Sequence, residues 1–392
     1  LLDCAERAAE AGHVDLLARA TFALLQLGGS SDVGAVNERV ARVTRRALDV
    51  LGDEESTAGI RAAASLAWSM TGEPERAREL FRSAERAATT PEVRRLVLPY
   101  AYLGLGLPGD VPRRGELADE LVALAEGADD PVALFEGLQL QVSTRVALAD
   151  GSGARKALDR MHGLIDLVGD VGRRWQLLYL SAALAHLDGE LEQAEDLAWR
   201  ALQLLAPVSP ARAAAAFHAQ VLALRLASGR LGEVTGILRT LVADQPAIPA
   251  WHAALALCLA HEVASGEAGS DDGAPARSDG ARAELEEHLR AALAHTTEDF
   301  TWLASHVMAA RAAAVGGASR DVLDELDARL APHADLVCWQ GTCSYGPVAV
   351  PLALLAAARE DARAAALATR ARALCAALDA PVFARELDPW GL

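Results

Sequence analysis

Residues 229–251, GRLGEVTGILRTLVADQPAIPAW, join a glycine, a run of apolar residues, a proline and the tryptophan of a following segment. Within the run, Val234, Leu238 and Leu241 recur four and three residues apart, which places them on one face of a helix. A glycine before such a run and a proline after it, here Pro246, are typical of helix boundaries. The stretch therefore predicts one helix of a helix hairpin.

The same frame occurs at two other places, where the fifth, ninth and twelfth residues after a glycine are again small or apolar. The positions that we assign to hairpin packing are Gly72, Ala77, Phe81 and Ala84; Gly189, Ala194 and Ala201, with Ala198 between them; and Gly229, Val234, Leu238, Leu241 and Pro246. Small side chains let two helices approach closely, and a larger one fills the gap beside them. The pattern resembles the tetratricopeptide repeat and predicts a tetratricopeptide-like α-α superhelix, a solenoid of antiparallel helix hairpins.

The composition predicts an all-α fold. Hydrophobic residues make up 52% of the 392 residues and aromatic residues only 4%, while the strong helix formers alanine, leucine and arginine dominate. Helices are expected over 1–27, over 92–105 with a kink at Pro99, and over 347–359 after Gly346-Pro347, and no strand is expected. One continuous domain is expected over 1–392, with a flexible loop at about 265–280, SGEAGSDDGAPARSDG.

Charge, apolar runs and cysteine usage indicate which partners and which cellular compartment to expect. There are 37 basic and 54 acidic residues, and the net charge of −17 repels a phosphate backbone, so no direct nucleic acid binding is expected. Arg, Asp or His interrupts every long apolar run, so no membrane span is expected. The five cysteines are scattered and favour reduced thiols of a cytoplasmic protein: Cys4, Cys258, Cys338, Cys343 and Cys375.

No stretch carries a recognisable catalytic motif. The single lysine, Lys156 in GSGARKAL, is not followed by Ser or Thr, so there is no Walker phosphate loop. GTCSYG at 341–346 lacks the spacing of a nucleophile elbow. We therefore expect no enzymatic activity and no cofactor in this segment, and we nominate no catalytic or metal-binding residue.

Histidines provide the alternative to this interpretation. Glu284 and His288 lie one helical turn apart, but a metal site would need a third ligand from elsewhere, and a solvated helix face is favoured. Four further histidines surround the predicted loop: His252, His261, His295 and His306. Packing or surface positions are favoured for them over a pH-sensing or ligand-contacting role.

Tryptophans are the remaining candidates for a binding surface. An aromatic residue in a helical array can line the concave face and contact a protein or small-molecule effector. The candidates for such a groove are Trp175, Trp251, Trp302 and Trp339. For each of them a wedge between packed hairpins is the favoured interpretation, and the groove is the alternative.

Three stretches resemble a known family. Residues 229–260, residues 345–385 and the opening LLDCAERAAEAGH are similar to the C-terminal helical region of large actinobacterial signal-transduction ATPases with numerous domains (STAND), of the LuxR-type and cyclase-associated kinds. The last hairpin departs from the family pattern, because Ala358-Arg359-Glu360 has no glycine. The resemblance implies a parent protein whose separate ATPase domain binds ATP and contacts this segment.

We therefore expect a ligand- or protein-sensing helical-repeat module of a cytoplasmic ATP-dependent transcription regulator, not catalytic by itself and part of a longer chain. The alternative is a free-standing tetratricopeptide scaffold for protein-protein interaction. A third hypothesis is a helical metal enzyme that uses the histidine-rich segment 252–306.

Overall fold

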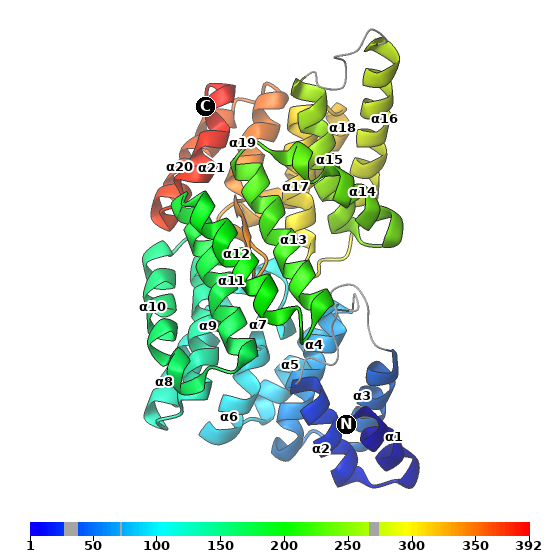
Figure 1. Cartoon of the computed structure of the whole chain (residues 1–392), viewed down its shortest axis with the longest axis vertical. Helices are drawn as coiled ribbons and strands as arrows, with labels where there is room; N and C mark the ends of the chain where they lie inside the picture. The colour runs from blue at the N-terminus through cyan, green and yellow to red at the C-terminus, as the bar shows by residue number, and fades with distance from the viewer. Residues whose placement is uncertain (27–37, 71–72, 266–273) are drawn as a thin grey trace. The chain divides into compact units, whose positions relative to one another are not determined.

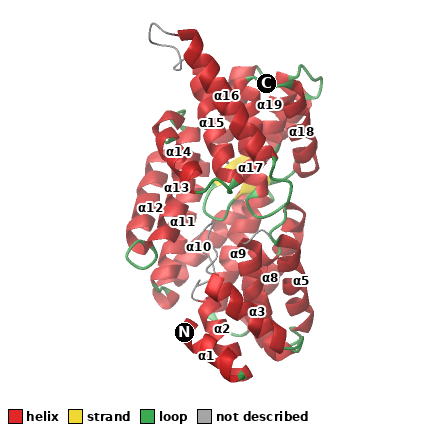
Figure 2. Ribbon diagram, turned by 90° about the vertical axis from the view of Figure 1, so that its right-hand side faces the viewer, coloured by secondary structure: helices red, strands yellow, loops and turns green. Residues whose placement is uncertain are grey.

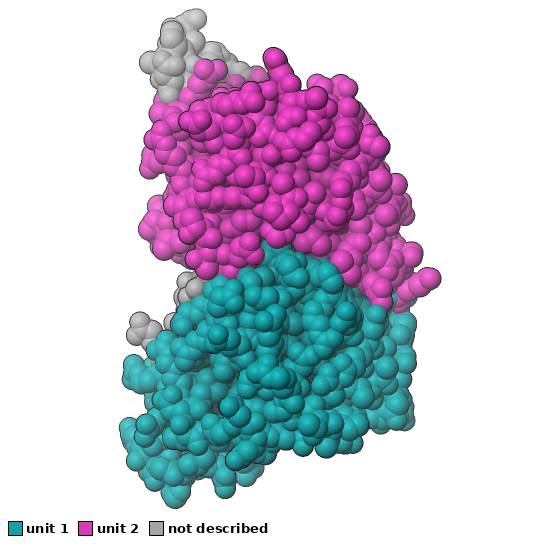
Figure 3. Space-filling model, turned by 180° about the vertical axis from the view of Figure 1, so that it is seen from behind, with its two compact units in different colours: residues 1–144, 157–173 teal, residues 145–156, 174–392 magenta. Residues whose placement is uncertain are grey.

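The fold is helical, as the composition predicts. The computed structural model describes residues 1–26, 38–70, 73–265 and 274–392, and Gly72 lies outside them (Figure 1). In the described residues the only sheet is a two-stranded hairpin, which confirms the all-α class. The chain divides into two compact units, coloured separately in Figure 3. Unit 1 comprises 1–144 and 157–173, and unit 2 comprises 145–156 and 174–392. One continuous repeat domain stays a prediction.

Unit 1 contains short helices around a buried apolar core. Its helices are α1 (Leu2–Ala11), α2 (Val14–Gln26), α3 (Glu38–Val50), α4 (Ala58–Met70), α5 (Pro74–Ala87), α6 (Pro91–Val97), α7 (Ala101–Gly104), α8 (Val111–Gly127) and most of α9 (Pro131–Ala147) and α10 (Gly151–Val168). Phe81 of α5 is fully buried among residues of α4, α6 and α8. The start of α9 is capped by Asp130, whose carboxylate accepts the Ala133 N–H at 3.0 Å.

Two expected helices of unit 1 are interrupted. The helix expected over 1–27 is divided into α1 and α2, because Gly12 has a φ of 69° and the His13 N–H turns back to the Ala8 carbonyl at 2.9 Å. The kink expected at Pro99 is confirmed. A 3-10 turn over Leu98–Tyr100 separates α6 from α7, since proline has no N–H for an α-helical hydrogen bond.

Unit 2 contains the longer helices and the two strands. Its elements are α11 (Val171–Asp188), α12 (Leu191–Leu205), α13 (Pro210–Ala227), α14 (Thr235–Asp244), α15 (Pro249–Ser265), α16 (Ala274–Leu293), α17 (Trp302–Gly316), α18 (Arg320–Leu330), β1 (Val337–Trp339), β2 (Ser344–Pro347), α19 (Ala349–Ala358), α20 (Ala364–Leu378), α21 (Pro381–Ala384) and the 3-10 helix η7 (Arg385–Trp390). Of the predicted loop at 265–280, residues 266–273 lie outside the described residues. The rest of that prediction is wrong from Ala274 onward, where α16 begins.

Three apolar helices form the centre of unit 2. α15 packs on α17, and α17 packs on α19, while α16, α18 and α20 cover them. Every residue over 253–260, 302–314 and 349–356 is buried. A helix that is apolar on all sides is stable only when other helices surround it. No helix in the part of the chain described here is both long enough and apolar enough to cross a membrane.

One type of turn ends helix after helix. The first or second residue beyond the helix has a positive φ, and the N–H of the residue after it donates to the carbonyl five residues earlier, a Schellman motif. The positive-φ residues of these turns are Gly12, Asp129, Ala149, Gly189, Gly229, Gly317, Glu360 and Asp379. In the last hairpin, which has no glycine at its turn, Glu360 adopts the positive φ that glycine provides in several other turns. Ala149, Gly189 and Gly229 follow one another at intervals of 40 residues.

A buried hairpin corrects two sequence predictions. Val337–Trp339 and Ser344–Pro347 form antiparallel strands where none was expected, and the helix expected from 347 begins at Ala349. Figure 2 shows the strands beside α17. The backbone N–H and C=O groups of the two strands form hydrogen bonds with each other, so this buried segment does not need a helix to satisfy them. The tip of the hairpin contacts α13. There the Gln220 amide donates to the Thr342 carbonyl at 2.8 Å.

Arg311 joins this hairpin to α17. The side chain is 1% exposed, although the neighbouring residues of α17 are apolar. Its guanidinium donates to the Tyr345 carbonyl of β2 at 2.9 Å and to the Glu386 carboxylate of η7 at 2.6 Å. The charge is therefore buried together with its counter-charge, as a buried arginine requires.

Gly346→Ala is expected to destabilise unit 2 more than Gly229→Ala. Both glycines have positive φ, 79° and 69°, so alanine is strained at each by roughly 1–2 kcal/mol. A Cβ at 346 would lie 2.6 Å from the Phe383 ring, whereas nothing lies within 4 Å of one at 229. We expect the first variant to lose about 1–3 kcal/mol more in urea unfolding. Equal losses would contradict the close contact with Phe383.

Candidate functional site

The residues predicted to pack the hairpins are mostly buried. Those that are buried in α5, α12 and the α14 region are Ala77, Phe81, Ala84, Ala194, Ala201, Val234 and Leu238. Gly189 and Gly229 occupy positive-φ turns. Leu241 is only half-buried. Pro246 is exposed, since it lies in the turn before α15, which Pro249 opens.

Three of the four tryptophans proposed for a groove belong to the interior. Trp175, Trp302 and Trp339 are 4%, 4% and 7% exposed, and Trp339 lies in β1 rather than on a helix. Trp175 meets Tyr179 edge to face at 4.7 Å, and Trp302 stacks on His306 at 4.2 Å. Trp251 is half-buried at the start of α15. The groove alternative is therefore wrong for the three buried rings, which have almost no surface for a ligand.

A different tryptophan is at the surface. Trp199 of α12 is 49% exposed, and its ring meets the half-buried Phe217 of α13 at 5.5 Å between centroids. Val208, in the turn between these helices, is 70% exposed. We call Trp199, Val208 and Phe217 the α12–α13 face. Sequence periodicity did not distinguish Trp199 from the buried tryptophans, because helices of this chain carry apolar residues on several sides.

Aromatic and titratable side chains gather around Trp302. The members of this Trp302 cluster are His295, Asp299, Trp302, His306, Arg329 and His333. His306 Nδ1 donates to the Trp302 carbonyl at 2.8 Å, and its Nε2 accepts from Arg329 at 2.8 Å. Burial lowers the pKa of His306 to about 4, so the ring is neutral at pH 7. With both nitrogens engaged, His306 holds the cluster together.

Asp299 orients the neighbouring histidine of the cluster. Its carboxylate lies 3.0 Å from His295 Nε2 and accepts the Thr301 N–H at 2.7 Å. Burial opposes the negative charge, but the hydrogen bonds from His295 and Thr301 outweigh it, so that the pKa of Asp299 is lowered. His295 Nδ1 is buried without a hydrogen-bond partner among the described residues. Sequence proximity alone brought His295 and His306 into one candidate group, and the structure places their rings 6.2 Å apart.

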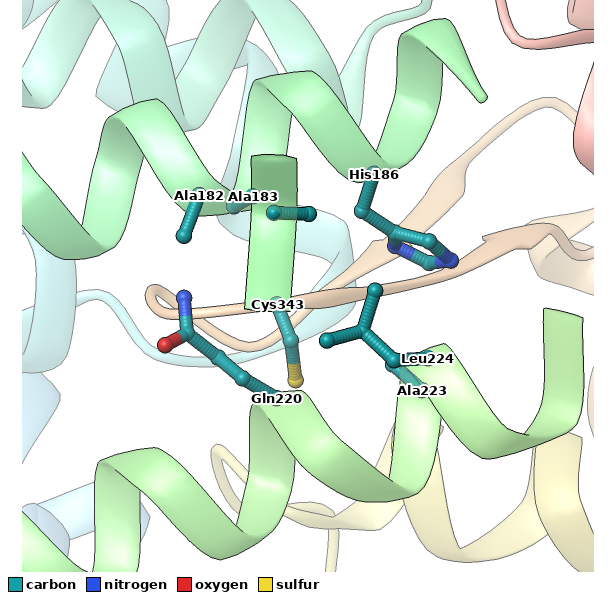
Figure 4. A pocket seen from close by; sticks show the side chains of 8 residues that line it. Ala182, Ala183, His186, Gln220, Ala223, Leu224 and Cys343 are labelled. Atoms are coloured by element: carbon teal, nitrogen blue, oxygen red, sulfur yellow. The ribbon is translucent and has the colours of Figure 1, made fainter. Parts of the chain in front are cut away.

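A small cavity lies between α11, α12, α13 and the hairpin (Figure 4). Its volume is about 10 Å³, room for roughly one water molecule. Its polar lining comes from His186, Gln220 and Cys343, and Figure 4 shows the Cys343 thiol between Gln220 and Leu224.

Burial keeps the cavity's titratable groups neutral. It lowers the pKa of His186 to about 4 and raises the pKa of the Cys343 thiol to about 12. A cysteine nucleophile needs the opposite shifts, towards a thiolate beside an imidazolium. The arrangement therefore stabilises the packing of the hairpin and does not activate the thiol. All five cysteines are free, and only Cys4 is exposed.

The remaining candidate is the α15–α16 contact. His252 Nδ1 lies 2.9 Å from His288 Nδ1, and Glu284 pairs with Arg239 of α14 at 3.0 Å. His261, the fourth histidine of the predicted group, is half-buried elsewhere on α15. With the side chains as they lie, the described residues contain no group of three or more His, Cys, Asp or Glu side chains that could hold a metal ion, and at the α15–α16 contact the Glu284 carboxylate is turned to Arg239.

Comparison with known protein families finds none that matches the chain, and comparison with curated proteins finds no similar sequence.

Trp199→Ala is expected to change the free energy of unfolding by no more than about 1.5 kcal/mol, because half of the ring is already in water. Trp68→Ala is the matched control. Its ring is 2% exposed, and truncation of a buried tryptophan costs about 3–5 kcal/mol. Urea unfolding curves measure both. A loss at Trp199 as large as that at Trp68 would show that Trp199 belongs to the core.

His306→Gln is expected to make stability less dependent on pH. The unfolded histidine has its usual pKa near 6.5, and the folded pKa is about 4, so the unfolded state binds more protons between these values. The contribution of His306 is thus fully present above pH 6.5 and is lost as the pH falls to 4, on the order of 3 kcal/mol.

Thermal or urea unfolding at pH 7.5, 5.5 and 4.5 measures this loss. The variant is expected to lose less stability on acidification than the wild type. His13→Gln, at an exposed turn of unit 1, serves as the control and should follow the wild type. Identical pH profiles for His306→Gln and the wild type would contradict a buried neutral imidazole.

Proposed function

We propose that the chain is a ligand- or protein-sensing helical-repeat module of an ATP-dependent transcription regulator of the STAND/LuxR type, and that it has no catalytic activity of its own. In this proposal the helix hairpins form a tetratricopeptide-like solenoid. A separate ATPase domain of the parent protein is the partner whose state the module controls.

The observation that carries the proposal is the recurrence of one hairpin design. The same Schellman turn ends helices in both units. The small residues predicted to pack the hairpins, such as Ala77 of α5 and Ala194 of α12, are buried. Each hairpin of a repeat array buries its apolar face on its neighbours and leaves a second surface for a partner. The α12–α13 face, with Trp199 half exposed, has the composition of such a surface.

The side chains with strongly perturbed pKa values give no support to a catalytic role. His186 and His306 are neutral and buried, and their neighbours are core residues of unit 2. Catalytic groups usually combine a perturbed pKa with a cleft that admits a substrate. Here the cavity beside His186 has room for roughly one water molecule.

The proposal predicts that magnesium and ATP do not stabilise this chain. The only lysine lies outside any phosphate loop, and the parent ATPase domain would hold the nucleotide. Ligand at a hundredfold excess over its Kd would add about 2.7 kcal/mol of stability, which a thermal melt detects easily. We expect melting curves with MgATP and with MgCl2 alone to coincide. A magnesium-dependent rise in Tm with ATP would contradict the proposal.

The reading frame upstream of Leu1 tests the regulator assignment separately. A glycine-rich loop with its lysine in the same frame would support a parent ATPase. A start codon immediately before Leu1 would contradict it and would favour the free-standing scaffold.

A further inference from the structure

The side chains of His252 and His288 meet between two helices of unit 2. Their Nδ1 atoms lie 2.9 Å apart, and this contact joins the start of α15 to the C-terminal part of α16. The ring planes are inclined by 47° and the centroids are 5.1 Å apart, so the rings meet through their nitrogens and do not stack. His288 is 8% exposed, and His252 is half-buried.

The hydrogen bonds decide which nitrogen of His252 carries a proton. Its Nε2 lies 3.0 Å from the Pro246 carbonyl, which only accepts, so Nε2 is protonated. The Nδ1 atom of the neutral ring then presents a lone pair to His288. A backbone carbonyl that receives the other ring N–H is also the arrangement that orients metal-binding histidines.

A carboxylate lies one helical turn away. Glu284 precedes His288 by four residues on α16, so both side chains lie on one face of that helix. The Glu284 carboxylate pairs with Arg239 at 3.0 and 3.2 Å, but the Glu284 and Arg239 side chains are 35% and 47% exposed. The pair is bidentate, so a metal ion would have to displace Arg239 from both carboxylate oxygens, and the exposure of both side chains to water weakens this competition.

We propose that His252 and His288 bind a divalent transition-metal ion of the zinc class through their Nδ1 atoms, and that Glu284 leaves Arg239 to become the third ligand. Zinc accepts imidazole and carboxylate ligands in a tetrahedral arrangement, with water at the remaining position. His252 is the additional ligand that Glu284 and His288 would need, and it could not be identified from the sequence. The proposed site is independent of the proposed function and concerns binding, not catalysis.

On binding, the two Nδ1 atoms move apart only slightly, but each ring turns by roughly 35° so that both lone pairs point at one metal ion, and Glu284 moves away from Arg239. Zn–N bonds of about 2.0–2.1 Å hold two tetrahedral ligands roughly 3.3 Å apart, so the nitrogens separate by about 0.4 Å from their present distance. The proton between the rings moves from His288 Nδ1 to His288 Nε2 through water. The imidazole stays neutral, and no net proton is released.

The charged groups around the pair favour a cation. Glu284 and Glu287 of α16 oppose the positive charge of Arg239 from α14, which leaves one net negative charge beside the two rings.

Titration calorimetry with ZnCl2 at pH 7.5 tests the proposal on the metal-free chain. The background variant is Cys4→Ser, which removes the exposed thiol as a competing ligand. We expect saturable binding of one Zn²⁺ per chain and no binding of Mg²⁺, which prefers oxygen ligands. His252→Gln and His288→Gln should each weaken binding at least about tenfold. His13→Ala, at an exposed turn, should leave it unchanged.

A second measurement does not depend on the variants being folded. In ¹H–¹⁵N spectra of the histidine side chains, zinc should shift the Nδ1 signals of two of the ten rings. Absence of saturable binding would overturn the proposal. So would equal affinity in folded His252→Gln and His288→Gln variants, or zinc-induced shifts at other histidines.

Discussion

The ion pair between Arg311 and Glu386 is the interaction on which the C-terminal part of unit 2 depends. The residues of α17 next to Arg311 are apolar, and an unpaired guanidinium among them would be destabilising by several kcal/mol. The partners of Arg311 are the Tyr345 carbonyl of β2 and the Glu386 carboxylate of η7, which lie 34 and 75 residues further along the chain. The helix therefore keeps its arginine only when the hairpin and the C-terminal segment close over it. The short sheet thus provides the backbone carbonyl that one face of the guanidinium needs.

Alanine packing sets the architecture around this ion pair. With only 4% aromatic residues, the chain fills its interior with small side chains, and helices such as α15 and α17 approach closely along buried alanines. Close packing of this kind needs well-defined turns between helices. The repeated Schellman turn provides them, and at Ala149, Glu360 and Asp379 it does so with residues that adopt positive φ at some energetic cost.

The histidines show how one residue type serves two purposes. His306 and His186 lie in the core, where burial keeps them neutral and their rings fill space between aromatic neighbours. His252 and His288 instead direct two nitrogens at each other between α15 and α16. Spacing along the chain predicted a group of histidines around α15 and α16. Spacing did not predict which of them would pair, because His252 and His288 lie on different helices and only Glu284 is a helical neighbour of His288.

The sequence by itself determined the helical class, most helix positions, the kink at Pro99 and the buried frame residues such as Ala77 and Leu238. These follow from local periodicity and from the backbone chemistry of glycine and proline, which act within a few residues. Tertiary structure alone decided the hairpin at 337–347, the burial of Trp175 and Trp302, the exposure of Trp199 and the contact between His252 and His288. Each of these depends on which surface of one helix another segment covers. Where apolar residues occur on every side of a helix, local periodicity does not say which side faces a neighbour.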